Sequence, residues 1–120
     1  MGDKQNVRVR RAYDEPERDD GTRVLVDRIW PRGLAKDKAR FDLWFKQVAP
    51  STELRKWYSH DPERFEEFRR RYREELKDVE RAQALEHLRE LGQGGTLTLL
   101  TATRHAEISE AAVLADLIRG

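Results

Sequence analysis

The chain contains no cysteine, which excludes disulfide bonds, thiolate metal sites and cysteine nucleophiles. Its three histidines, His60, His87 and His105, lack the spacing of a metal site, so neither a metal nor a cofactor is expected. No apolar run approaches the roughly 18 residues of a membrane span, and the N-terminal region has no signal-peptide core. We therefore expect a soluble, cytoplasmic protein that does not associate with membranes.

Neither sign of charge predominates. The chain has 24 Lys and Arg against 23 Asp and Glu, a formal net charge of +1. The overall charge therefore says nothing about a polyanionic partner, and only local clusters can do so. Charged residues make up 39% of the chain and hydrophobic ones 38%, which predicts a heavily solvated surface around a lean core. A length of 120 residues suits one domain, residues 1–120, which we expect to be a monomer or a weak dimer.

Several motifs of well-known enzymes are missing. There is no Walker loop, no dinucleotide-binding glycine motif, and no serine or cysteine in a nucleophile elbow. His60 and Asp61 together suggest a catalytic pair, but Asp61 followed by Pro62 is typical of a helix start, which gives Asp61 a structural role. Whether the protein is an enzyme therefore stays open.

What is present is an alternation of strand and helix patterns. Apolar periodicity predicts strands at 7–13, 23–30 and 96–101, an ambiguous strand or helix at 41–48, and helices at 52–58, 61–78, 80–91 and from about 108 onward. One face of the helix that starts at 61 is apolar: Phe65, Phe68, Tyr72, Leu76 and Val79. This order predicts an α/β fold, a single compact domain with a small, mostly parallel sheet flanked by helices.

Five long and unusual segments follow one another along the chain. They are RRAYD (10–14), GTRVLVDRIWPRG (21–33), APSTELRKWYSHDPERF (49–65), EFRRRY (67–72) and LTLL (97–100). Together they resemble the YeaO-like family of uncharacterised proteins, domain of unknown function 488 (DUF 488). The resemblance spans essentially the whole chain and implies a compact α/β fold without an established activity. Some members are labelled as regulators of the MarR type, but this chain opens with a strand and shows no winged-helix pattern.

The end of the chain departs from the pattern of similar proteins. These usually read Tyr-Ala-Ala-Arg/Lys-Asp after the last strand, whereas this chain has Thr101-Ala102-Thr103-Arg104-His105. They usually have Asn-His-Ala at the start of the final helix, where this chain has Ser109-Glu110-Ala111. Ser109 can cap a helix as asparagine does. Glu110 replaces a histidine, so any chemistry that this histidine performs in relatives is in doubt here.

The stretch from Asp27 to Gly33 is the richest in chemistry. Arg28 and Arg32 supply planar guanidinium groups suited to phosphate or carboxylate, and Trp30 lies between them. In parallel α/β sheets, ligands bind just beyond the carboxyl ends of the strands, which is where this stretch falls. Gly33 would allow close backbone approach. The alternative is a structural corner in which Asp27 and Arg28 satisfy buried backbone groups.

A second arginine-bearing loop, with Arg104, follows the last predicted strand. If the two strands are parallel neighbours, both loops open on the same edge of the sheet, and we expect Asp27 to pair with one of the arginines there. Tyr13 could join from the first strand, with His60 as a lower-ranked neighbour. The sequence thus predicts a site for a small anionic ligand (phosphate, nucleotide or carboxylate), formed by Asp27, Arg28, Trp30, Arg32, Arg104, Tyr13 and His60.

Two other functions remain open. A nucleic-acid-binding or regulatory module could use the basic residues Lys4, Arg8, Arg10 and Arg11, although these are few for such a surface. The arginines at 69–71 and 73 are interleaved with glutamates, which favours a solvated helix face, and nucleic acid is not the expected partner. A protein-interaction domain without catalysis would instead expose an apolar patch.

Overall fold

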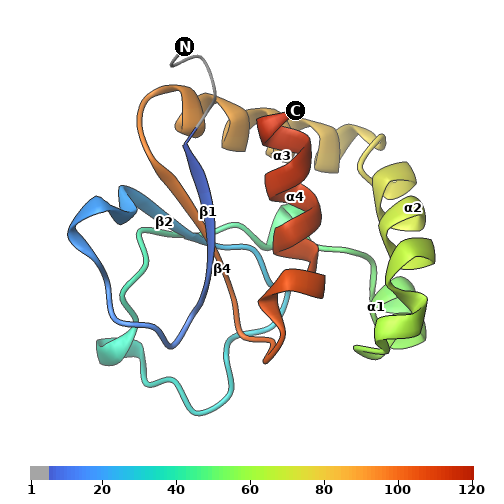
Figure 1. Ribbon diagram of the computed structural model, residues 1–120, viewed down its shortest axis with the longest axis horizontal. Helices are drawn as coiled ribbons and strands as arrows, with labels where there is room; N and C mark the ends of the chain where they lie inside the picture. Colours follow the sequence, from blue (N-terminus) through green and yellow to red (C-terminus); the bar gives the residue numbers. More distant parts are fainter. Residues whose placement is uncertain (1–5) are drawn as a thin grey trace.

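The computed structural model describes residues 6–120, in which four α-helices pack on a four-stranded sheet (Figure 1). The strands are β1 (Val7–Arg11), β2 (Thr22–Leu25), β3 (Leu43–Trp44) and β4 (Leu97–Thr101). The helices are α1 (Thr52–Tyr58), α2 (Phe65–Glu75), α3 (Val79–Gln93) and α4 (Glu110–Arg119). All four strands are parallel, in the order β1-β4-β2-β3. The predicted α/β fold with a small parallel sheet is confirmed.

The two faces of the sheet are covered differently. Val24 and Leu99 point from neighbouring strands into the main core, to which all four helices contribute. The next residue along each strand, Leu25 or Leu100, points the other way into a small cluster with Phe41. Because side chains alternate along a strand, this division follows directly from the sequence. The helices therefore cover one face, while loops cover the other. Among residues 6–120, no helix has the length and apolar character required to cross a bilayer.

Two strands are shorter than predicted. β1 ends at Arg11 instead of Tyr13, because the Asp14 carboxylate accepts the Arg11 backbone N–H at 2.9 Å and closes a turn. β2 ends at Leu25 instead of Trp30. The backbone N–H of Val26 still donates to Leu100 at 3.1 Å, but the chain then leaves the sheet at Asp27. Aspartate side chains readily accept hydrogen bonds from nearby backbone N–H groups, and one lies at each of these strand ends: Asp14 bonds to Arg11, and Asp27 to Ala102 beyond β4.

The ambiguous segment 41–48 contains elements of both kinds. Its centre is the two-residue strand β3, and Lys46–Val48 forms a 3-10 turn. The helix predicted from 61 begins as a 3-10 turn at Pro62–Arg64 and becomes α2 at Phe65. A two-residue strand beside a single turn leaves too little periodicity for a sequence pattern to separate them.

The predicted apolar face of residues 61–78 is wrong at its last member. Phe68 and Tyr72 are buried, but Val79 is 75% exposed. Asp78 ends the preceding segment and caps α3, since its carboxylate accepts the backbone N–H of Arg81 at 2.8 Å. Val79 therefore starts a new helix with a different direction. In the same way Ile108 lies in a 3-10 turn, and α4 begins only at Glu110, after the Ser109 cap.

A buried carboxylate holds the β1–β2 connection to the loop-covered face. Asp20 is 1% exposed and forms ion pairs with Arg23 at 2.5 Å, Arg10 at 2.8 Å and Arg8 at 3.2 Å. Burial raises the pKa of Asp20, but the backbone N–H of Glu17 and these guanidinium groups lower it further, so the net pKa lies below its ordinary value. Two of the arginines considered for nucleic-acid binding, Arg8 and Arg10, are thus engaged inside the protein. Lys4 lies outside the described residues.

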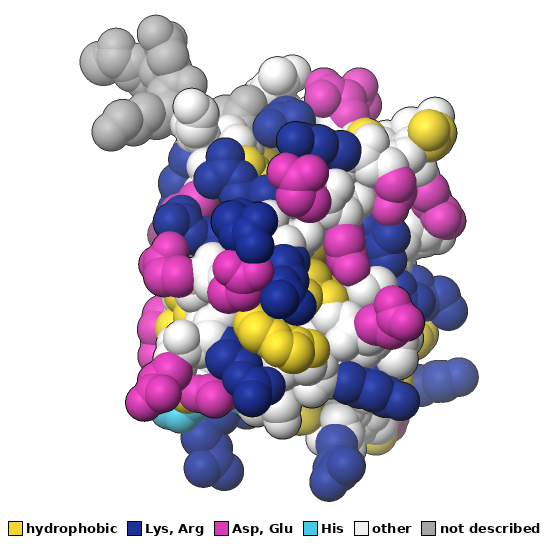
Figure 2. Space-filling view, turned by 90° about the vertical axis from the view of Figure 1, so that its right-hand side faces the viewer, with side chains coloured by type: hydrophobic (Ala, Val, Ile, Leu, Met, Phe, Trp, Pro, Cys, Tyr) yellow, Lys and Arg dark blue, Asp and Glu magenta, His cyan; other side chains and the backbone are white. Residues whose placement is uncertain are grey.

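The arginines of α2 are largely neutralised by their own helix, as predicted. Arg70 and Arg71 both bind Glu67, at 2.5 and 2.7 Å, and Arg69 binds Glu66 at 3.0 Å. Figure 2 shows basic and acidic side chains intermixed on the side of the molecule that carries α2. This face carries both signs of charge.

Candidate functional site

A cavity of about 740 Å³ opens at the carboxyl edge of the sheet. It lies between the loops that follow β1, β2 and β4, the helix α1 and the N-terminal end of α4. All seven residues that the sequence predicts for a ligand site line it: Tyr13, Asp27, Arg28, Trp30, Arg32, His60 and Arg104. Their proximity is therefore a property of the fold, and their binding of a ligand remains a prediction.

The parallel pairing of β2 and β4 brings the two arginine-bearing loops together. Leu25 is opposite Leu100, so both strands end at the same edge. Arg11, at the end of β1, fixes the second loop, because its guanidinium group donates to the backbone oxygens of Ala102 at 3.2 Å and Thr103 at 3.1 Å. The backbone that carries Arg104 is thereby held against β1.

Four arginines line the cavity, and none of them forms an ion pair within residues 6–120. They are Arg28, Arg32, Arg55 and Arg104. Arg28 donates to the backbone oxygen of Pro50 through Nε and a terminal nitrogen, at 3.3 Å in both cases. Arg32, Arg55 and Arg104 are exposed. Positive charge without a protein counterion is thus concentrated around this cavity.

Asp27 does not form the arginine pair that the sequence suggested. Its carboxylate accepts hydrogen bonds from Thr101 Oγ1 and from the backbone N–H of Ala102, both at 2.8 Å. The N–H of Ala102 is the first one beyond β4 and would otherwise have no partner in the sheet. Asp27 thus joins the ends of β2 and β4. Because it forms no ion pair with the arginines of the cavity, their positive charge is not neutralised by Asp27.

Glu110, the first residue of α4, lies against Asp27. Burial raises the pKa of Glu110 well above its ordinary value, and the negative charge of Asp27 and a hydrogen bond with it act in the same direction. Arg55 opposes this shift but does not cancel it. Glu110 therefore keeps its proton to a higher pH than an ordinary glutamate does. A pair that carries one negative charge repels an anion less than two carboxylates would.

Replacing Glu110 with glutamine should make the protein more stable than the wild type, by an amount that grows as the pH rises. The folded state holds the Glu110 proton more tightly than the unfolded chain does, so the wild type loses up to about 1.4 kcal/mol per pH unit between roughly pH 4.5 and the raised pKa. Glutamine mimics the protonated form and removes this loss.

Thermal unfolding of both proteins from pH 5 to 8 measures the effect. The charged and titratable groups that face Glu110 are Asp27, Arg55 and Tyr58, with His60 and His105 also on the cavity wall, and all of them are common to both proteins. A difference between the two melting temperatures that stays constant with pH would contradict the raised pKa of Glu110.

Aromatic side chains form a rigid wall of the cavity. The indole of Trp30 donates to the backbone oxygen of Leu34 at 2.6 Å, and its ring lies 5.4 Å from those of Phe41 and Trp44. The hydroxyl of Tyr13 donates to the backbone oxygen of Arg32 at 2.8 Å. This bond holds the main chain of the loop and leaves the guanidinium group of Arg32 free to move.

Gly33 has a different role from the one predicted. Its φ of 78° lies in the left-handed region, and no atom approaches within 4 Å of the position that a Cβ would take. It therefore permits a tight turn after Arg32. Close backbone approach occurs instead at Gly21, where a Cβ would lie 2.2 Å from the backbone oxygen of Thr96.

The hydroxyl groups around the cavity are already engaged. Ser109 Oγ donates to the backbone oxygen of Ala106 at 2.6 Å and accepts from Ala112, and the hydroxyl of Tyr58 donates to Ile108 at 2.6 Å. Burial raises the pKa of Tyr58 to about 12, with the charges of Glu110 and Asp61 contributing. His60 Nδ1 contacts Thr103 Oγ1 at 3.2 Å. The described residues therefore place no activated serine or tyrosine nucleophile at the cavity.

The prediction that Asp61 has a structural role agrees with its contacts. Its carboxylate accepts the backbone N–H of Glu63 at 3.0 Å and pairs with Arg64 at 3.6 Å.

Sequence reasoning missed some residues of the cavity. Arg55 and Tyr58 belong to the helix predicted at 52–58 and were not predicted for the ligand site, yet both line the cavity with Ser109 and Glu110. Arg55 precedes Tyr58 by three residues, so both lie on one side of α1. The sequence spacing indicates that these two side chains share one side of a helix. That this side faces the cavity follows only from the position of α1 beside the ends of β2 and β4.

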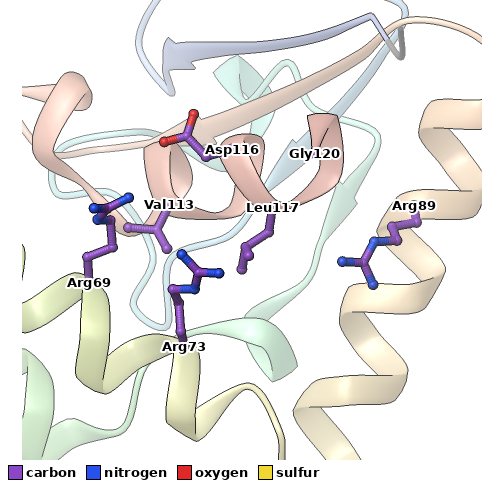
Figure 3. A pocket seen from close by; sticks show the side chains of 7 residues that line it. All are labelled: Arg69, Arg73, Arg89, Val113, Asp116, Leu117 and Gly120. Carbon is purple, nitrogen blue, oxygen red and sulfur yellow. The ribbon is translucent and has the colours of Figure 1, made fainter. Parts of the chain in front are cut away.

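A second, smaller cavity of about 390 Å³ lies among α2, α3 and α4. Figure 3 shows Arg69, Arg73 and Arg89 directed toward the space beside Leu117 of α4. Arg69 and Arg89 already have ion pairs on their own helices, with Glu66 and Glu86. Arg73 forms none within residues 6–120, which makes it a useful reference for the arginines of the larger cavity.

Comparison with known proteins shows the family of this chain. The model of a family described as "Inactive DUF488-N3 subclade" matches residues 6–120. This chain belongs to the DUF488 family. It is 40% identical to the uncharacterised protein YeaO of Escherichia coli over 114 residues, which cover 95% of this chain and 97% of YeaO.

Uncharacterised mycobacterial proteins are also similar to this chain. An uncharacterised protein of Mycobacterium tuberculosis, Rv3073c, is 56% identical over 114 residues, covering 95% of this chain and 94% of its own. A Mycobacterium bovis protein, also uncharacterised, has the same identity and coverage. No solved structure matches the chain. The YeaO-like resemblance stated from the sequence is thus confirmed.

Proposed function

We propose that this DUF488 protein binds a small anionic ligand in the cavity at the carboxyl edge of its sheet. The observation that carries the proposal is the set of four cavity-lining arginines without a carboxylate partner among the described residues. Guanidinium groups bind phosphate and carboxylate through two parallel hydrogen bonds, and like charges gathered around one cavity are relieved by an anion. A cavity of about 740 Å³ has the size of pockets that hold small organic molecules.

Replacing Arg32 with alanine should abolish stabilisation by an anion while leaving the ligand-free melting temperature nearly unchanged. Arg32 is exposed, and the bond from Tyr13 goes to its backbone oxygen, which the substitution keeps. Inorganic phosphate at about ten times its Kd should add about 1.4 kcal/mol to the wild type.

Thermal unfolding with increasing phosphate, at constant ionic strength, measures this effect for both proteins. Arg104→Ala should behave like Arg32→Ala, and Arg73→Ala, in the other cavity, should respond to phosphate like the wild type. Equal phosphate responses from all four proteins would refute binding in the larger cavity.

Binding without catalysis is the form of this function that we favour. The matching family is described as inactive, the hydroxyls of Ser109 and Tyr58 are engaged, and Asp61 caps a helix. Glu110 stands where similar proteins usually carry histidine, so a step that this histidine performs in relatives would not proceed in the same way here. These features together favour recognition of a ligand over its conversion.

Nucleic-acid binding receives less support. Arg8 and Arg10 are paired with Glu17, Asp19 and Asp20, and Arg11 donates to backbone oxygens on the opposite face of the sheet. Nucleic-acid surfaces need several free cations along one face. Tight DNA binding that survives about 0.2 M salt would overturn this view and favour the regulatory alternative.

A protein-interaction surface also receives less support. The large hydrophobic residues that are exposed lie apart on different elements, on β3, at the start of α3 and in the two loops beside the cavity: Leu43, Val79, Tyr13 and Ile29. Scattered exposed apolar residues are normal on a protein surface. Tyr13 and Ile29 also line the cavity, where contact with a small molecule explains their exposure.

A further inference from the structure

The cavity offers more than positive charge, and its other groups narrow the class of ligand. Phosphate alone would occupy a small part of a cavity of about 740 Å³. The remainder is lined by aromatic rings, among them Trp30 and Tyr58, and by the carboxyl pair of Asp27 and Glu110. A ligand that fills this volume must therefore satisfy polar acceptors as well as arginines.

The carboxyl pair is held in place and has hydrogen-bonding capacity left. Asp27 Oδ1 accepts from Thr101 and Oδ2 from Ala102, and Asp27 also forms a hydrogen bond with Glu110. Because each carboxyl oxygen can accept two hydrogen bonds, acceptor positions remain free on both side chains. Glu110 is partly buried and is fixed at the first position of α4. These two side chains are thus prepared to accept hydrogen bonds from hydroxyl groups in a partly desolvated place.

The outer arginines and the carboxyl pair differ in how exposed they are. Arg32 and Arg104 are exposed, while Asp27 and Glu110 are partly buried and Tyr58 is buried. Trp30 also lines the cavity, and its indole N–H is already used by Leu34. The cavity thus combines an exposed cationic part, an apolar wall and a partly buried carboxyl pair.

From this arrangement we infer that the ligand is a phosphomonoester of a polyol or sugar. Its phosphate binds the exposed arginines, and its hydroxyl groups donate to Asp27 and Glu110. This inference rests on the proposed anion-binding function and adds the chemical class of the group that the phosphate is attached to. It requires that hydroxyl groups on the ligand increase affinity. If only the arginines and the apolar wall contributed, the more apolar of two phosphates of equal size would bind at least as tightly.

Two phosphomonoesters with five carbons test this requirement. Ribose 5-phosphate carries hydroxyl groups and n-pentyl phosphate carries none, so they differ mainly in what they offer the carboxyl pair. Isothermal titration of the wild type should give ribose 5-phosphate an affinity at least about tenfold higher than that of n-pentyl phosphate, as expected for hydrogen bonds to a charged acceptor. Inorganic phosphate should bind more weakly than ribose 5-phosphate.

Substitution of the carboxyl pair locates the effect. Asp27→Asn should reduce the preference for ribose 5-phosphate to about threefold or less while inorganic phosphate binds at least as tightly as it does to the wild type. Because Asp27 also holds Ala102, this variant could unfold, and Glu110→Ala provides a second variant with the same expectation. Arg73→Ala, in the other cavity, should keep the full preference.

The outcomes separate the inference from the function on which it rests. If inorganic phosphate and both esters fail to bind, the anion-binding function is wrong and the inference falls with it. If all three bind and n-pentyl phosphate equals or exceeds ribose 5-phosphate, the anion site stands and the sugar phosphate is rejected. A preference that neither carboxyl variant reduces also rejects the role of the pair.

Discussion

Replacing Phe68 with alanine is expected to lower the free energy of unfolding by about 3–5 kcal/mol. Phe68 is 2% exposed in the middle of α2, and its ring stacks on Tyr58 at 4.2 Å and lies 5.7 Å from Tyr72. Removing this ring leaves a void where α1 and α2 meet the sheet. The neighbouring rings of Tyr58 and Tyr72 could fill the void only by leaving their present positions.

Chemical denaturation at equilibrium measures this loss, and a domain of this size should unfold in one cooperative step. Val79→Ala is the matched control. Val79 was predicted on the same face but is 75% exposed, so its replacement should change stability by no more than about 0.5 kcal/mol. Similar losses in the two variants would show that the burial of α2 is described wrongly.

The second large effect is expected at the buried ion cluster of the loop-covered face. Asp20→Ala should cost about 3–5 kcal/mol, because it leaves the buried guanidinium group of Arg23 without its carboxylate. Asp19→Ala is the control, since the side chain of Asp19 is 82% exposed and its ion pair with Arg8 should contribute at most about 1 kcal/mol.

The pH dependence of the Asp20→Ala effect provides a further check. The pKa of Asp20 is lower in the folded protein than in the unfolded chain, so its contribution is present above the unfolded value of about 4 and is lost as the pH falls through the folded pKa. The difference in stability between wild type and variant should therefore shrink in acid. A difference that is unchanged at low pH would mean that Asp20 acts through packing alone.

The same cluster helps to explain why the cavity is the stronger candidate for a function. Arginines on the loop-covered face are matched by Asp20 and its neighbours, and those of α2 mostly by glutamates one turn away. Around the cavity the carboxyl groups of Asp27 and Glu110 bind each other and the backbone instead of the arginines. Uncompensated charge is thus retained beside a concave surface.

The sequence by itself determined the class of fold and the position of the cavity. The apolar run Val24-Leu25-Val26 and the pattern of Leu97–Leu100 identify buried strands, because only a strand covered on both faces is apolar at every position. Arginine-bearing loops after both strands then suggested a shared edge. Asp61 and Ser109 were recognised as helix caps because a cap depends on residues within one turn of chain.

Only the tertiary structure decided what each charged group binds. Asp27 was expected to hold an arginine, but the ends of two strands far apart in sequence bring it to the N–H of Ala102 and to Glu110. Arg55 reaches the cavity because α1 ends beside the same edge. Val79 is exposed because α3 turns away after Asp78. Local periodicity fixes which residues share an element, whereas partners and burial depend on how separate elements pack, and no local pattern contains that information.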